Sequence, residues 1–146
     1  MGKHKGFTLI ELVVVVMILG ILAAVAAPKL LNTSSSAADN GLKETLGVVR
    51  DAIERYAAEH AGALPGLDGT QATFQANLAP YLRVFPKCPV AGNNNNVKIV
   101  ATASPLVAPQ GAGESWLYTT LDGGFVCNSH AKVQSQSDPT VTYDTL

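Results

Sequence analysis

The sequence is poor in the side chains that carry most catalytic and metal chemistry. It has three histidines and two cysteines in 146 residues, and 14% of its residues are charged. His60 and His130 are isolated, and the sequence contains no Cys/His metal spacing and no glycine-rich phosphate loop. These absences predict that the protein is not an enzyme and that it has no cofactor.

The charge balance does not favour nucleic-acid binding. After Pro28 the chain has eight Lys or Arg residues against ten Asp or Glu residues. A nucleic-acid binder draws much of its affinity from neutralising phosphates, which requires an excess of positive charge. Once the N-terminal segment is set aside, the remaining length fits one domain at most.

The N-terminal segment contains the most informative feature. An almost unbroken apolar run covers Val13–Ala27, and Glu11 is the one acid near its start. As a helix, residues 7–31 would reach ~37 Å, which is enough to cross a bilayer. A carboxylate at a bilayer centre costs about 2.5–3.5 kcal/mol on insertion scales. An acid retained at that cost indicates a specific partner.

An ordinary secretory signal is the alternative for this segment. The two leading lysines would supply its basic start, and Ala23–Ala27 would serve as its cleavage region. Glu11 interrupts the apolar core of such a signal, and Gly6-Phe7 is a sharp border between charged and apolar residues. We therefore expect a retained membrane-spanning helix whose basic end stays in the cytoplasm.

The border Gly6-Phe7-Thr8-Leu9-Ile10-Glu11 resembles the leader border of type IV pilins and of the pseudopilins of type II secretion. The short basic leader, the apolar helix and Pro28 follow the same pattern. The resemblance implies that a prepilin peptidase cleaves after Gly6 on the cytoplasmic side and methylates the new amine of Phe7. The subunit would then wait in the bacterial inner membrane until it enters a helical filament.

Cleavage would place a positive amine on Phe7, one helical turn from Glu11. Because an unpaired buried charge is heavily penalised, the amine of one subunit and Glu11 of its neighbour would favour one stagger of the bundled helices. The alternative is that Glu11 only reaches the lipid headgroups. Gly20 and Pro28 weaken a helix interior, and we interpret them either as a flexible stretch or as a simple bend.

Helical periodicity returns after a weak region at Asn32–Ser36. Apolar residues recur there every three or four positions, which predicts a buried helix stripe. The members of this stripe are Leu42, Leu46, Val49, Ile53 and Tyr56. Gly62 and Pro65 predict the end of the helix. We expect one long helix from Phe7 to about Ala58, with a transmembrane lower half and an upper half packed on a small domain.

The rest of the chain predicts loops and a small antiparallel sheet. A short helical patch is expected at Thr73–Pro80, and a strand at Val97–Ala101. Trp116–Leu121 and Phe125–Asn128 flank a glycine turn and predict a hairpin, and Thr140–Tyr143 is a candidate final strand. The expected fold class is α+β and pilin-like, with a long helix packed on an antiparallel sheet.

Four segments are expected along the chain. They are a leader at 1–6, a transmembrane and polymerisation helix at 7–31, an amphipathic upper helix at 32–60, and a periplasmic loop-and-sheet domain at 61–146. The phrases Ala57–Pro65 and Tyr81–Pro89 resemble the segment that follows the long helix in the major pseudopilin. A Trp116-x-Tyr118 strand that runs into a glycine turn also resembles the pseudopilin sheet.

Cys88 and Cys127 would both lie outside the inner membrane. An even pair of cysteines in an exported domain favours a disulfide, and two free buried thiols are the alternative. A disulfide that closes a loop of ~40 residues would stabilise the domain by ~4 kcal/mol on the chain-entropy model.

The resemblance also implies a calcium site in the C-terminal loop, built from acidic and carbonyl oxygens. Calcium takes about six to eight oxygen ligands, usually with several carboxylates. Here the C-terminal acids Asp122, Asp138 and Asp144 are well separated. The chain departs from the family at this point, and calcium is disfavoured.

The favoured interpretation is a structural subunit of a type II secretion pseudopilus that forms a homopolymer through its N-terminal helices. Its implied partners are the prepilin peptidase, the inner-membrane assembly platform and minor pseudopilins. The alternative is a type IV pilin for adhesion, motility or DNA uptake, which the pair Cys88 and Cys127 would suit. A membrane-anchored enzyme or binding module is more remote, because the sequence predicts no cleft with clustered ionisable groups.

Overall fold

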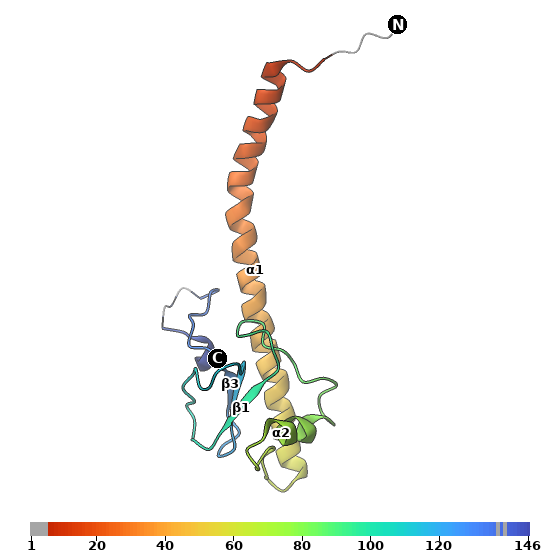
Figure 1. Ribbon diagram of the computed structural model, residues 1–146, viewed down its shortest axis with the longest axis vertical. Helices are drawn as coiled ribbons and strands as arrows, with labels where there is room; N and C mark the ends of the chain where they lie inside the picture. The colour runs from red at the N-terminus through yellow and green to blue at the C-terminus, as the bar shows by residue number, and fades with distance from the viewer. Residues whose placement is uncertain (1–5, 137, 139) are drawn as a thin grey trace. The chain divides into compact units, whose positions relative to one another are not determined.

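The computed structural model describes residues 6–136, 138 and 140–146, so residues 1–5 of the expected leader lie outside the described residues. The chain divides into two compact units, Met1–Ser35 and Ser36–Leu146. Its elements are α1 (Leu9–Glu59), α2 (Gln71–Leu78), β1 (Val97–Val100), β2 (Trp116–Thr119), β3 (Phe125–Cys127) and the 3-10 turn η1 (Tyr143–Thr145) (Figure 1).

Helix α1 agrees with the long helix that the sequence predicted. Helical geometry is continuous through Gly20, Pro28 and the weak region at 32–36. Beyond Glu59 the chain turns at Gly62, which has a φ of 87° and whose amide donates a 2.8 Å hydrogen bond to the Ala57 carbonyl. Glycine readily adopts this left-handed conformation, and it commonly closes a helix in this way.

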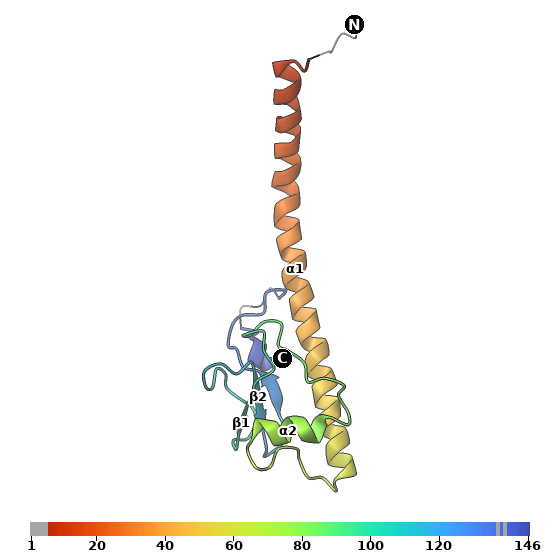
Figure 2. The same ribbon diagram turned by 45° about the vertical axis from the view of Figure 1, so that its right-hand side comes forward.

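The second unit is built around the stripe on the second half of α1. Four predicted members of the stripe are buried, and Tyr56 lies partly buried at its margin. The stripe packs against a cluster of buried aromatic side chains. These are Phe74, Trp116, Tyr118 and Phe125. Burying a large apolar side chain contributes about 1.5–3 kcal/mol, so this cluster holds the sheet and α2 against α1. Figures 1 and 2 show the sheet beside the second half of α1, with α2 close to its end.

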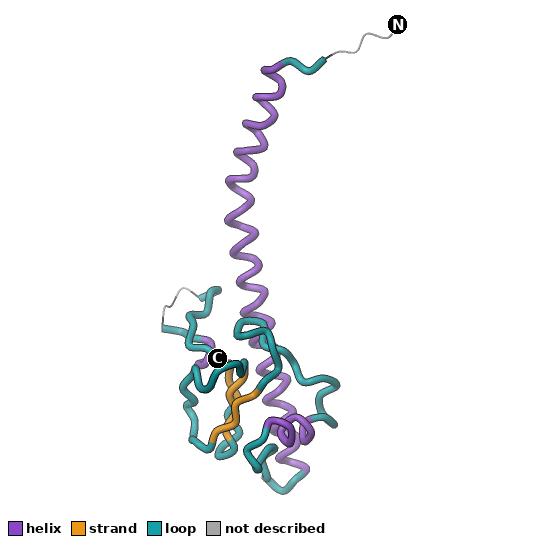
Figure 3. Tube along the Cα trace, in the orientation of Figure 1, coloured by secondary structure: helices purple, strands orange, loops and turns teal. Residues whose placement is uncertain are grey.

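The sheet has the strand order β1-β2-β3 and is mixed. Strands β2 and β3 are antiparallel, with Trp116 opposite Cys127 and Tyr118 opposite Phe125, so the predicted hairpin is confirmed. The prediction of an antiparallel sheet was wrong for β1, which runs parallel to β2. The connection through residues 101–115 is long enough to cross over and return the chain to the same end of the sheet, as a parallel pair requires. Figure 3 shows this connection as loop.

The two remaining predicted elements had different outcomes. The short helical patch is α2, which begins after Thr70, and the Thr70 hydroxyl accepts a hydrogen bond from the Thr73 amide. The predicted strand at Thr140–Tyr143 was wrong. Within the described part of that segment, Thr142 forms only an isolated bridge with Lys132, and Tyr143 begins η1. The α+β class, with a helix packed on a small sheet, is confirmed.

Candidate functional site

Thr8 and Glu11 form a capping box at the start of α1. The amide and the hydroxyl of Thr8 donate to Oε2 of Glu11 at 2.9 and 2.7 Å, and the Glu11 amide donates to Oγ1 of Thr8 at 3.3 Å. This reciprocal pairing satisfies amides that a helix N-terminus leaves free. The Thr-x-x-Glu spacing is its usual signature. Thr8 was not predicted as a capping residue, although this spacing in the sequence is a signal for it.

Glu11 lies on a helix surface that is otherwise apolar and exposed. Leu9–Ala27 has a mean hydropathy of 3.0 and is long enough to cross a membrane, and none of it is buried within the chain. Even the least exposed large apolar side chain of this segment, Val14, is 42% exposed. An apolar surface of this extent needs lipid or other helices to cover it.

Two of the predicted site residues, Phe7 and Glu11, lie together at the start of α1. Phe7 and Glu11 line one groove of about 400 Å³ with apolar neighbours on the same helix, and Glu11 is the charged group in it. Gly6 and Phe7 precede the first helical residue, so the bond between them lies in non-helical chain. Gly20 and Pro28 lie within α1, and their flexibility stays a prediction.

Cys88 and Cys127 are brought together in the second unit. Their Sγ atoms are 3.5 Å apart, and both residues are fully buried. Cys127 ends β3 opposite Trp116, whereas Cys88 lies in the loop after α2, where its amide donates to the Asn94 carbonyl at 3.0 Å. The two residues are free thiols in this structure, so the disulfide stays a prediction.

Asp39 is a buried acid that was not predicted as a site residue. It lies on α1 one turn before Leu42 and is fully buried. Tyr143 donates to its Oδ1 at 2.6 Å, and the Ser135 amide donates to its Oδ2. Burial acts to raise the pKa of Asp39, but these hydrogen bonds and the charge of Lys43 leave it below its ordinary value. An acid at a stripe position gives no apolar signal, so periodicity could not find it.

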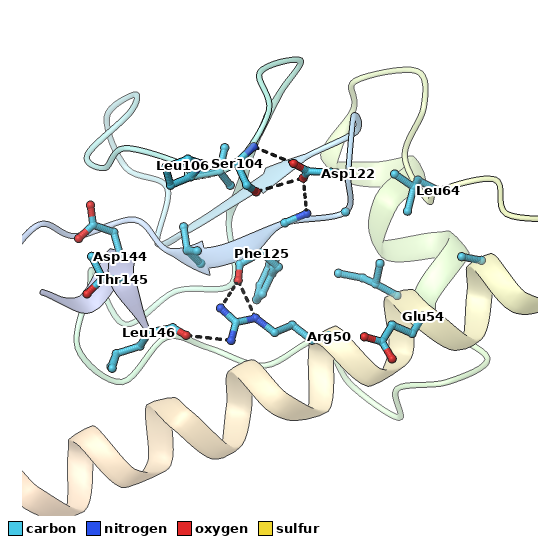
Figure 4. A pocket seen from close by; sticks show the side chains of 16 residues that line it. Arg50, Glu54, Leu64, Ser104, Leu106, Asp122, Phe125, Asp144, Thr145 and Leu146 are labelled. Atoms are coloured by element: carbon cyan, nitrogen blue, oxygen red, sulfur yellow. Dashed lines mark hydrogen bonds between the residues drawn. The ribbon is translucent and has the colours of Figure 1, made fainter. Parts of the chain in front are cut away.

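Arg50 lines a pocket of about 580 Å³ between α1 and β3 (Figure 4). Its Nε and Nη2 donate to the Phe125 carbonyl at 3.0 and 2.8 Å, and its Nη1 donates to the Leu146 carbonyl at 2.9 Å. Desolvation lowers the pKa of Arg50 from its usual value. The guanidinium is therefore a structural link between α1, β3 and the C-terminal segment.

The three C-terminal acids form hydrogen bonds with different partners in separate parts of the domain. The Asp122 carboxylate accepts hydrogen bonds from the amides of Ser104 and Gly124, and the Asp138 carboxylate accepts one from the Thr140 amide. Asp144 lies 3.0 Å from Nδ1 of His130. In the described part of the chain, no group of three or more His, Cys, Asp or Glu residues could hold a metal ion.

The comparisons with known proteins agree with the N-terminal geometry. Residues 1–27 match the family model of the prokaryotic N-terminal methylation motif. The chain is 42% identical over 71 residues to fimbrial protein EcpB of Eikenella corrodens, which covers 49% of this chain and 43% of that protein. It is 31% identical over 88 residues to type II secretion system core protein G of Klebsiella pneumoniae, which covers 60% and 63%. The chain thus spans less than two thirds of these relatives. No solved structure matches it significantly.

A further relative is matched over nearly its whole length. ComG operon protein 3 homolog of Bacillus licheniformis is 30% identical over 97 residues, which covers 66% of this chain and 91% of that protein. Pilins and pseudopilins form a structural, non-enzymatic family. Membership in this family implies processing by a prepilin peptidase and polymerisation. The N-terminal motif, the exposed apolar helix and this coverage show that the chain belongs to the type IV pilin family.

Proposed function

We propose that this pilin-like chain is a structural subunit of a type II secretion pseudopilus and polymerises through its N-terminal helix. The observation that carries polymerisation is Glu11, the one acid on a helix surface that is otherwise suited to lipid. The proposed processing step is cleavage after Gly6 followed by methylation of the Phe7 amine.

The hydrogen bonds that Glu11 accepts come from neutral groups, so they do not neutralise the charge of its carboxylate. Thr8 supplies two donors to the carboxylate, and no ion pair to Glu11 is present among the described residues. In a bundle of processed helices, the Phe7 amine of one subunit can approach Glu11 of its neighbour. Because an unpaired buried charge is strongly destabilising, the stagger that forms this pair is favoured over others.

The proposed location is the bacterial inner membrane, with a single pass at 7–31 after removal of the leader at 1–6. The upper helix at 32–60 and the domain at 61–146 would lie in the periplasm. Gly20 and Pro28 would allow the helix to bend or loosen during assembly. The assembly platform and minor pseudopilins are the proposed partners, and the subunit would end in a filament in the periplasm.

The match to a type II secretion protein supports the pseudopilus. The match to core protein G of Klebsiella pneumoniae covers 88 residues, and α1 ends at Glu59. An aligned stretch of that length extends beyond the leader and α1 into the loops that follow. The match therefore includes part of the chain that follows α1, in addition to the N-terminal helix, and it is longer than the 71-residue match to the fimbrial protein.

A type IV pilin is the second candidate, and two observations favour it. The match to the fimbrial protein has a higher identity of 42%, although over the shorter stretch of 71 residues. Cys88 and Cys127 also lie close enough for a short movement to join them. In this case the filament would extend from the cell surface.

Deletion of the gene in the bacterium that carries it would distinguish the two filaments. A pseudopilus subunit should be required for the export of enzymes into the medium, while surface pili remain. Re-expression of the intact chain should restore export, and re-expression of a Glu11→Ala variant should not. Loss of surface pili with normal export would instead assign the chain to a type IV pilus.

A further inference from the structure

Asp144 is a buried acid that keeps one oxygen without a partner. It lies in η1, and only 4% of its side chain is exposed. Its Oδ2 accepts a 3.2 Å hydrogen bond from the Ala108 amide and lies 3.0 Å from Nδ1 of His130. Its Oδ1 is buried and has no hydrogen-bond partner among the described residues. A buried carboxylate with an unsatisfied oxygen is costly unless a positive charge lies close to it.

We infer that His130 and Asp144 form a proton-sensitive clamp, in which the protonated imidazole holds η1 against the crossover at residues 101–115. The crossover takes part because the Ala108 amide donates to the same oxygen that His130 contacts. This clamp goes beyond the proposed function, and it does not depend on which filament the chain forms.

His130 is the cation that can pair with Asp144. Among the described residues, their contact is the one acid–base pair within ion-pair distance. Arg50, Glu54 and Asp122 line the same pocket as Asp144. However, the Arg50 guanidinium donates to backbone carbonyls, and Figure 4 shows Glu54 and Asp122 on the opposite side of the pocket from Asp144. None of these three groups replaces the imidazole as the partner of the buried carboxylate.

Two further titratable groups lie near the pair. Cys127 lies near the Asp144 carboxylate, and the neighbouring thiol and burial raise the pKa of Cys127, so it stays neutral. Lys132 is exposed and lies two positions after His130. Its charge acts on Asp138, whose pKa is lowered mainly by hydrogen bonds from Thr140. The imidazole is therefore the group beside Asp144 whose charge changes near neutral pH.

Two protonation steps set the pH range of the clamp. Burial acts to raise the pKa of Asp144, but hydrogen bonds, first among them the one from His130, leave it below its ordinary value of 3.8. Asp144 is therefore ionised above pH 3.8, and its contribution is lost as the pH falls through the lower value of the folded state. Histidine gains its charge as the pH falls from about 8 to about 5. The charged pair thus exists between about pH 4 and pH 6 and is lost as the pH rises further.

The clamp joins two walls of the pocket between α1 and β3. Residues 104–106 of the crossover form part of one wall, and residues 144–146 form part of another. The bond from the Ala108 amide to Asp144 connects these two stretches. Because a charge-assisted hydrogen bond is stronger than a neutral one, the two walls should separate less often when His130 carries its proton.

Hydrogen exchange of the Ala108 amide tests the clamp. The full-length chain in detergent is exchanged at pH 5.5 and at pH 8, and NMR follows this amide. Each rate is divided by the rate of an unfolded peptide at the same pH, so that the comparison reports opening alone. We expect about 2–5-fold greater protection at pH 5.5. The factor is small because 63% of the His130 side chain is exposed and solvent screens its charge. Equal protection at the two pH values would overturn the inference.

Two histidine variants identify the group responsible. His130→Gln keeps an exposed polar side chain but removes the titratable charge, so the two pH values should then give the same protection of the Ala108 amide. His60→Gln is the matched control, because His60 is exposed and its Nδ1 contacts the Tyr56 carbonyl and not an acid. This control should keep the difference between the two pH values. A difference that survives in His130→Gln, or that disappears in His60→Gln, would show that another group controls the opening.

Discussion

Tyr143 donates a 2.6 Å hydrogen bond to the buried carboxylate of Asp39, across 104 positions of the chain. The bond ties η1 to the second half of α1 at the first turn of the buried stripe. The Ser135 amide donates to the same carboxylate, so two parts of the C-terminal segment depend on one acid. Asp39 thus anchors two parts of the C-terminal segment to α1, in addition to the link that Arg50 makes to Leu146.

Removing the Tyr143 hydroxyl should destabilise the second unit. Tyr143→Phe leaves the buried carboxylate with one donor fewer, and we expect the free energy of unfolding to fall by about 1.5–3 kcal/mol. Tyr81→Phe is a matched control, because the Tyr81 hydroxyl donates to Glu59 on the exposed surface, and we expect a change below about 0.5 kcal/mol. Denaturant unfolding followed by tryptophan fluorescence measures both. Equal losses would mean that burial does not strengthen the Asp39 bond.

The same pair of residues predicts how stability depends on pH. The pKa of Asp39 is lowered from 3.8, so its contribution is present above pH 3.8 and is lost as the pH falls through the lower value of the folded state. Burial and the bond to Asp39 raise the pKa of Tyr143 from 10 to about 12, so its contribution is present below pH 10 and is lost as the pH rises through about 12. Unfolding temperatures across this range should therefore fall at both ends. Tyr143→Phe should reduce the alkaline fall, and an unchanged alkaline fall in this variant would contradict the assignment.

Arg50 should contribute more to the stability of the second unit than Arg55, the other arginine of α1. Arg50→Met removes hydrogen bonds to the carbonyls of Phe125 and Leu146, and we expect a loss of about 1.5–3 kcal/mol. Arg55 is exposed and forms no ion pair among the described residues, so Arg55→Met should change stability by less than about 0.5 kcal/mol. Thermal unfolding of the two variants under identical conditions provides the comparison. A loss at Arg55 as large as that at Arg50 would argue against the link to β3.

Glu11→Ala should block entry into filaments and leave membrane insertion intact. The variant lacks the charge that the neighbouring amine would pair with, while the apolar segment becomes more hydrophobic. Thr8→Ala is the matched control, because it removes the capping box at a cost of about 1 kcal/mol but keeps the carboxylate. Membrane fractionation measures insertion, and chemical crosslinking of neighbouring subunits in whole cells measures assembly. The assembly role of Glu11 is refuted if Glu11→Ala forms filaments at the normal level.

The mature protein should begin at a methylated Phe7. Cleavage after Gly6 removes both leading lysines, and intact mass spectrometry of the membrane-extracted protein would detect the lost residues and the added methyl group. A Gly6→Leu variant should remain uncleaved and supplies the control mass. An N-terminus at Met1, or after Ala27, would contradict processing at this border.

The sequence predicted those parts of the fold that depend on local periodicity or turn chemistry. Leu42 and its stripe follow helical spacing, and the Asp122-Gly123-Gly124 turn allows the hairpin because Gly123 adopts a φ of 77°. The direction of β1 was missed because it depends on the path of a long loop, which no local pattern specifies. Asp39 was missed because its carboxylate is satisfied by residues distant in sequence. The approach of Cys88 to Cys127 was anticipated from their number and context, whereas the capping role of Thr8 was missed although it has a local signature.

The crossover at residues 101–115 has a consequence for how the protein can diverge. Its ends are fixed by the register of β1 against β2, and most of its residues are exposed. Lengthening a surface loop costs little free energy, because the entropy of closure grows only slowly with length. Insertions and new side chains can therefore accumulate there without altering α1 or the hairpin. Related subunits can therefore change what this part of their surface displays while they keep the same means of assembly.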